Sequence, residues 1–155
     1  MVKRFAIISL AAMIVSAWLA VPSAAQEESW SFGGGYWSLP NVEGADVDTN
    51  GIYASAAIST MSYRLELDYA IGDPGFLALA ADYLYPLDGG AGYFGGSGFI
   101  GLGYTYFSAD DLDNESGFNV IAGAAVGESF QGSIRYDFLG SDQELFTIGL
   151  SYSFF

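Results

Sequence analysis

The amino-acid sequence predicts an all-β fold: an eight-stranded, antiparallel, up-and-down transmembrane β-barrel that follows a cleaved signal peptide. Three observations predict it. Beyond residue 25, large apolar residues recur at every second position, which is the period of a β-strand. Only 14% of the residues are charged, well below the roughly 25% of a soluble domain. Aromatic residues make up 17% of the chain beside 21 glycines, so rings and very small side chains can occupy opposite faces of the strands.

Residues 1–25 have the pattern of a signal peptide. Lys3 and Arg4 precede an apolar run over residues 5–21, and the small residues Ser23 and Ala25 fit cleavage after Ala25. The apolar run is at the short edge of the ~17–25 residues that a membrane-spanning helix needs. We therefore expect export from the cytoplasm and a mature chain, residues 26–155, that forms one outer-membrane β-barrel domain.

The first four predicted strands alternate between an apolar and a polar or small face. The third is the clearest, because Arg64, Glu66 and Asp68 share one face and only apolar residues occupy the other. The fourth adds Asp82 to the polar face. The four segments are 29–39, 51–60, 62–70 and 76–85, with apolar faces formed by Trp30, Phe32, Gly34, Tyr36, Ile52, Ala54, Ala56, Ile58, Tyr63, Leu65, Leu67, Tyr69, Leu77, Leu79, Ala81, Tyr83 and Tyr85.

The last four predicted strands continue the alternation. In the seventh, Arg135 and Asp137 lie on the polar face. The segments are 93–107, 117–126, 129–138 and 146–155, with apolar faces that include Ile100, Leu102, Tyr104, Tyr106, Phe118, Val120, Ala122, Ala124, Val126, Phe130, Ile134, Tyr136, Phe138, Phe146, Ile148, Leu150, Tyr152 and Phe154.

The connections between the predicted strands differ in length and charge. Those after the first, fifth and seventh strands are long or acidic, at 40–50, 108–116 and 139–144, whereas those after the second and sixth are minimal. Residues 71–75 are shorter, and residues 86–90 longer, than this rule expects. Transmembrane barrels have short periplasmic turns and longer outer loops, so we expect the acidic connections to be extracellular.

The charges decide which face of the barrel is outside. If the apolar faces pointed inward, about thirty large side chains would overfill an eight-stranded barrel, whose interior is only just wide enough for its own side chains. With the apolar faces outward, lipid covers them, and aromatic residues near the strand ends form two interfacial girdles. The lumen then holds small residues and Arg–carboxylate pairs, formed by Arg64, Glu66, Asp68, Asp82, Arg135 and Asp137.

The end of the chain resembles a known signature. Phe146, Ile148, Leu150, Tyr152 and Phe154 alternate with small residues, and "GLSYSF" resembles the closing strand of bacterial outer-membrane barrels. Phe155 is one residue beyond that pattern. The whole mature chain is similar in strand count to small eight-stranded barrels of the OmpA/OmpX type or the opacity type. This resemblance implies recognition by the barrel-assembly machinery and a location in the bacterial outer membrane.

The lumen charges have two interpretations. They are either a structural plug of paired charges, which we favour because eight strands leave little free lumen, or a gate on a narrow polar path. Catalysis is not expected. The chain has no Cys and no His, and the acid pair Glu66 and Asp68 has an Arg nearby and no second catalytic group.

Two acidic segments are candidate weak divalent-cation loops. "DVDTNG" matches the opening of an EF-hand loop, but its twelfth position is Ala57 where an EF-hand needs Glu. The alternative for both segments is an acidic loop that is simply solvated. The candidate residues are Asp46, Asp48 and Asn50 in the first segment and Asp111, Asp113 and Glu115 in the second.

Charge also limits the partners. After residue 25 the only cationic residues are Arg64 and Arg135, against 18 acidic residues, so we expect no binding to nucleic acid, whose phosphates would repel the chain. We expect a lipid-embedded monomer without cofactor and with a structural or surface-interaction role. Two alternatives stay open: a narrow channel or transporter for ions or small hydrophobic molecules, and a secreted soluble barrel that binds an apolar ligand.

Overall fold

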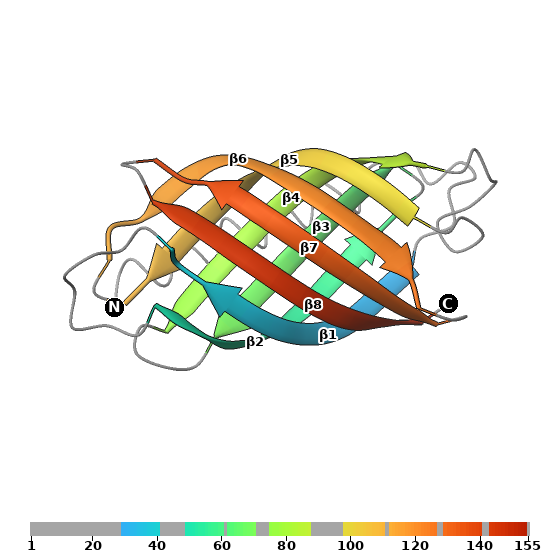
Figure 1. Ribbon diagram of the computed structural model, residues 1–155, viewed down its shortest axis with the longest axis horizontal. Helices are drawn as coiled ribbons and strands as arrows, with labels where there is room; N and C mark the ends of the chain where they lie inside the picture. The colour runs from blue at the N-terminus through green and yellow to red at the C-terminus, as the bar shows by residue number, and fades with distance from the viewer. Residues whose placement is uncertain are drawn as a thin grey trace.

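Eight antiparallel strands close into a barrel. The computed structural model describes residues 29–40, 49–60, 62–70, 75–87, 98–110, 112–126, 129–140 and 143–154, so the predicted signal peptide lies outside the described residues. Each strand pairs with its neighbours in chain order, and β1 pairs with β8 (Figure 1). The strands are β1 (Ser29–Ser38), β2 (Asn50–Ser59), β3 (Tyr63–Ala70), β4 (Phe76–Pro86), β5 (Gly98–Ala109), β6 (Glu115–Ala125), β7 (Phe130–Phe138) and β8 (Glu144–Phe154). The predicted fold class is confirmed.

The closing pair β1–β8 shows why the alternation is kept along the whole wall. Trp30 pairs with Phe154 and Ser38 with Phe146, without a break in register. Paired residues in adjacent strands point to the same side of a sheet, so rings lie beside rings on the outside and serines beside serines on the inside. Closure also removes the unpaired edge that an open sheet would expose.

Several strand boundaries differ from the prediction. The β5–β6 ladder continues through Tyr106–Ser116 and Phe107–Glu115, so the connection shrinks to 110–114, and β8 already begins at Glu144. Polar residues were expected to end these strands, but backbone pairing continues through them because hydrogen bonds of the ladder do not depend on side-chain polarity. The start predicted for the fifth strand, 93–97, lies outside the described residues.

The two ends of the barrel are defined by its connections. The terminal end is where β1 begins and β8 ends, and the loop end is the opposite one, with the connections after β1, β3, β5 and β7 (Figure 1). The two longest connections, 39–49 at the loop end and 87–97 at the terminal end, lie at opposite ends. The predicted difference in connection length between the ends is therefore wrong, and acidity is the property that distinguishes the loop end.

The outer wall is apolar and exposed. Phe118 is 74% and Leu102 68% exposed, as the alternation predicts for lipid-facing positions. Aromatic side chains stand outward near both ends: Trp30, Tyr63, Tyr83, Tyr85 and Tyr152 at the terminal end, and Tyr36, Tyr69 and Tyr104 at the loop end. An apolar surface of this extent is typical of a protein that contacts a membrane or another protein. Strands of 8–12 residues fit the ~9–11 tilted residues that cross a bilayer.

No helix in the described part of the chain is both long enough and apolar enough to cross a membrane.

The interior holds two apolar clusters. At the loop end a cluster is formed by Trp37, Leu39, Tyr53, Ala70, Phe76, Ala78, Phe107, Leu139 and Leu145, and at the terminal end a smaller one by Leu84, Phe99 and Ile121. The charged residues lie between them, and buried serines, among them Ser31, Ser59 and Ser153, lie at the terminal end as well. The prediction of a lumen lined by small residues and charges is thus incomplete, because large side chains near the strand ends also occupy inward positions.

Candidate functional site

The polar layer of the lumen is built by strand parity. On β3, Arg64, Glu66 and Asp68 are two residues apart, so all three point inward. On β7, Arg135 and Asp137 do the same. All five are buried, and the barrel brings β3 and β7 to face each other across the lumen.

Arg135 is the centre of this layer. Its Nε donates to Oδ2 of Asp137 at 3.1 Å, its Nη1 to Oε2 of Glu66 at 3.4 Å, and its Nη2 to Oδ2 of Asp68. The planar guanidinium presents donors in three directions, and here each direction meets a different carboxylate. Arg135 is 3% exposed, so the attraction within these pairs is little screened by solvent.

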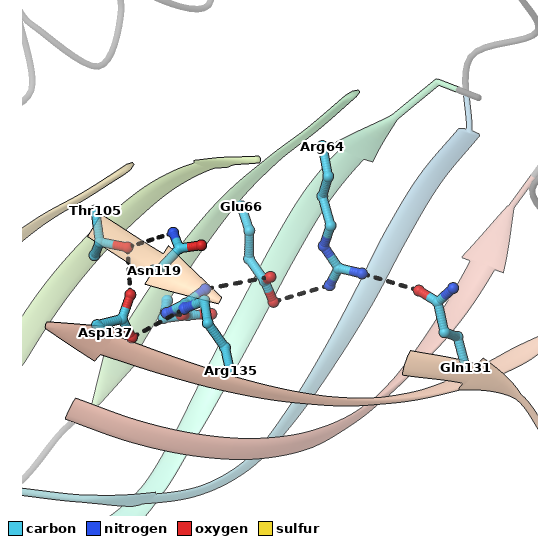
Figure 2. A network of polar contacts seen from close by, with 8 residues as sticks. Arg64, Glu66, Thr105, Asn119, Gln131, Arg135 and Asp137 are labelled. Atoms are coloured by element: carbon cyan, nitrogen blue, oxygen red, sulfur yellow. Dashed lines mark hydrogen bonds and ion pairs between the residues drawn. The ribbon is translucent and has the colours of Figure 1, made fainter. Parts of the chain in front are cut away.

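Glu66 connects the two arginines. Its Oε1 lies 3.0 Å from Nη2 of Arg64, while its Oε2 binds Arg135. Arg64 in turn extends its Nη1 to Oε1 of Gln131 at 2.9 Å, which ties β3 to β7 (Figure 2). The sequence predicted Arg–carboxylate pairs in the lumen, and the structure joins both arginines into one network through Glu66.

A second arm of the network extends from Asp137 to β5 and β6. The hydroxyl of Thr105 donates to Oδ1 of Asp137, and Nδ2 of Asn119 donates to Oγ1 of Thr105 at 2.8 Å (Figure 2). Gln131, Thr105 and Asn119 were not among the predicted site residues. Their inward parity beside the charged positions is the sequence signal that identifies them.

Asp82 stands apart from the ion pairs. Its backbone pairs with that of Arg64 in the β3–β4 ladder, and its side chain is buried in the same lumen. Neither of its carboxylate oxygens has a hydrogen-bond partner among the described residues. The structure therefore brings together five of the six predicted lumen charges and leaves the sixth without an ion pair in the described part of the chain.

The arrangement favours a fixed scaffold over chemistry. Removing charges from water is costly, and a buried pair offsets that cost only with good geometry and additional hydrogen bonds. Glu66 and Asp68 both accept hydrogen bonds from Arg135, so these two carboxylates act as counter-ions.

The candidate cation loops are only partly described. Asp46, Asp48 and Asp111 lie outside the described residues. Asn50 begins β2 and Glu115 begins β6, while Asp113 is exposed just before β6. Within the described residues, no group of three or more acidic side chains could hold a metal ion.

The predicted assembly signal forms the outer face of β8. Ile148, Leu150, Tyr152 and Phe154 are exposed, and Phe146 is half-buried on the same face. The ring of Phe154 packs edge-on against that of Phe32 at 5.9 Å across the β1–β8 seam. Phe155 lies outside the described residues.

Comparison with solved structures identifies the fold. No family model and no curated protein matches the chain. The N-terminal β-barrel domain of Pseudomonas aeruginosa OprF matches over 84% of this chain and 100% of its own length, with a TM-score of 0.52 and 14% identity. This chain has the fold of a small bacterial outer-membrane β-barrel. The predicted resemblance to the OmpA/OmpX type is confirmed at the level of fold.

Two structures of Ail, the attachment invasion locus protein of Yersinia pestis, also match this chain. One covers 83% of the barrel chain and 99% of Ail with a TM-score of 0.45 and 16% identity. The other is a complex of Ail with the heparin analogue sucrose octasulfate; it covers the same shares with a TM-score of 0.47 and 15% identity.

Proposed function

We propose that this outer-membrane barrel has a structural or surface-interaction role, with a lumen that is plugged by its own side chains. Residues 1–25 serve as the export signal and are absent from the mature protein. The bilayer is its main partner, and it acts as a monomer without cofactor.

The observation that carries this proposal is the layered interior. At the loop end, the ring of Trp37 meets that of Phe76 at 5.2 Å, and Phe76 meets Phe107 at 5.5 Å. Below them Arg135 is held by three carboxylates, and at the terminal end Leu84, Phe99 and Ile121 pack together. An ion would have to pass closely packed apolar side chains at the loop end, which cannot replace its hydration shell.

Conductance of the refolded protein in a planar bilayer tests the plug. We expect no steady current from wild-type barrels whose folding has been checked by gel mobility, while a wide porin in the same bilayer conducts. A steady open pore from the wild type would contradict the plug and favour the alternative of a narrow channel.

A surface role is supported by the distribution of charge. The two arginines beyond residue 25, Arg64 and Arg135, are both buried in the lumen. All other charged side chains beyond residue 25 are acidic. Ten of those acidic residues lie in or beside the connections after β1, β3, β5 and β7. A loop end of this kind would attract basic partners or divalent cations and repel other anions.

Assembly by the barrel machinery is the second partner relationship that we propose. The support is the resemblance of the closing strand and its exposed aromatic face on β8. Substitution of Phe154 by Ala should reduce insertion in cells but not refolding into vesicles, where no assembly factor acts. Equal insertion of both proteins in cells would contradict the assignment.

A further inference from the structure

Asp82 is a buried carboxylate for which the described residues provide no donor. It is 3% exposed, and neither Oδ1 nor Oδ2 accepts a hydrogen bond from the described part of the chain. Buried polar groups are nearly always hydrogen-bonded, and an isolated buried anion is far more costly than a neutral group. Something other than these side chains must therefore satisfy Asp82.

Asn119 presents a second unsatisfied oxygen at the same place. Asp82, Gly103 and Asn119 occupy one row across β4, β5 and β6. A Cβ atom on Gly103 would lie 2.9 Å from Oδ1 of Asn119 and also against Oδ1 of Asp82, so the two oxygens converge over the bare glycine. Both are acceptors, and Oδ1 of Asn119 has no donor among the described residues.

Exchanging the amide oxygen and nitrogen of Asn119 does not remove the problem. The nitrogen would then reach Asp82, but the oxygen would turn towards Oγ1 of Thr105, which now accepts from Nδ2 of Asn119 at 2.8 Å. The only hydrogen of the Thr105 hydroxyl is given to Asp137. The exchange would give Asp82 a donor, but one oxygen in the chain of Asn119, Thr105 and Asp137 would still lack one, and the exchange supplies no positive charge.

The charged side chains around Asp82 are already paired with other residues. Arg135 on β7 binds Asp137 on its own strand and Glu66 and Asp68 on β3, and Arg64 on β3 binds Glu66. Among the described residues, Tyr53 on β2 is a further titratable group that interacts with Glu66, Asp68 and Arg135. Two guanidinium groups thus face four carboxylates, and the carboxylate without an ion pair in the described residues is Asp82. The cluster lacks positive charge at that point.

We propose that Asp82 and Asn119 form a proton-binding site in the lumen, in which Asp82 is a carboxylic acid whose hydroxyl donates to Oδ1 of Asn119. A single proton on Asp82 turns this acceptor into a donor towards Asn119. The same proton removes the unpaired negative charge of Asp82. It also fits the narrow space over Gly103. A metal ion is less suited, because no group of three or more acidic side chains among the described residues could hold one.

Infrared difference spectroscopy in lipid at neutral pH tests the protonation directly. The spectrum of wild type minus Asp82→Asn should show the carbonyl band of a protonated carboxyl group, with a shift in heavy water. The matched control, wild type minus Asp137→Asn, should show only the loss of carboxylate bands, because Asp137 accepts hydrogen bonds from both Arg135 and Thr105. Absence of the acid band from the first difference would overturn the proposal.

Unfolding by urea in vesicles gives an independent readout. An amide at position 82 can donate to Asn119 as the acid does, so Asp82→Asn should keep the wild-type midpoint at neutral pH, whereas Asp137→Asn should lower it. Between the range in which an exposed aspartate titrates and the pH at which folded Asp82 loses its proton, folded wild type holds one proton more than the unfolded chain, so its stability falls as pH rises. Unfolding of wild type then releases one proton more than unfolding of Asp82→Asn. The base-10 logarithm of the unfolding constant should therefore increase with pH more steeply for wild type, by about one per pH unit.

Two outcomes of that experiment would overturn the proposal. One is a loss of stability in Asp82→Asn as large as in Asp137→Asn, because it would mean that position 82 needs a charged carboxylate. The other is a rise in wild-type stability with sodium or calcium ions that Asp82→Asn lacks, because a metal ion would then be the missing positive charge. Gel mobility shows for each variant that the measured protein was folded.

Discussion

At the scale of single residues, Arg135 is the side chain on which most buried charge depends. Three carboxylates, from Glu66, Asp68 and Asp137, bind its guanidinium. Arg64 contacts the carboxylate of Glu66 and the amide of Gln131 among the described residues. Loss of Arg135 would take a partner from three buried carboxylates, whereas loss of Arg64 would leave Glu66 still paired with Arg135. Loss of Arg135 should therefore lower the stability more.

We therefore predict unequal effects of the same substitution at the two arginines. Arg135→Met should destabilise the barrel by about 3–5 kcal/mol, the usual cost of breaking a buried pair. Arg64→Met should cost less, because Glu66 keeps Arg135. Urea unfolding in vesicles measures both, and equal losses at the two positions would contradict the central role of Arg135.

At the scale of the element, β7 shows how one strand has a polar face towards the lumen and an apolar face towards the outside of the barrel. Gln131, Arg135 and Asp137 point into the lumen, while Phe130, Ile134 and Phe138 are exposed to the outside. Because the side-chain period is two, a slip of one residue would exchange the two sets and place charges in lipid. The pairs Ile134–Ile148 and Arg135–Thr147 with β8 hold the register.

A charge on the outer face of β7 should cost energy that depends on depth. Ile134→Arg, near the middle of the strand, should destabilise the barrel by about 2–4 kcal/mol, and Phe130→Arg, at its terminal end, by only about 0–1 kcal/mol. The two wild-type side chains are about equally exposed, at 47% and 45%, so burial does not explain a difference. Equal costs in lipid vesicles would mean that this face does not lie across a bilayer.

The strands themselves could be predicted from the sequence better than their ends. Eight segments of period two were expected, and eight strands are found. The ends of β5, β6 and β8 were misplaced, because Ser108, Ser116 and Glu144 look like loop residues although the backbone ladder includes them. Side-chain polarity is a weak indicator of where backbone pairing stops.

At the scale of the whole molecule, the barrel is a closed wall with an apolar outside and a filled inside. This arrangement predicts resistance to gel detergent: protein refolded in mild detergent should migrate at a different position until it is boiled. A chain that stays soluble and β-rich without detergent and shows no shift would instead favour the secreted barrel for an apolar ligand.

The orientation in the membrane gives a second whole-molecule prediction. The sequence has no Cys, so a single introduced cysteine is the one thiol that a maleimide can label. Asp113→Cys at the loop end should react with a membrane-impermeant maleimide on intact cells, and Val126→Cys at the terminal end only after the outer membrane is permeabilised. Both positions are exposed. The reverse pattern would place the acidic connections in the periplasm.

By itself, the sequence determined the number of strands, their order and which face lies on the outside of the barrel. These properties follow from local alternation, together with two arginines that cannot be left unpaired in an apolar phase. Only the tertiary structure decided the partners inside. Glu66 and Arg135 are 69 residues apart, and Trp37, Phe76 and Phe107 meet only when the wall closes. Alternation gives the side of the sheet on which a residue lies, but strand register and closure decide which inward residues reach each other across the lumen. That is why Arg135 has three carboxylates and Asp82 faces Asn119.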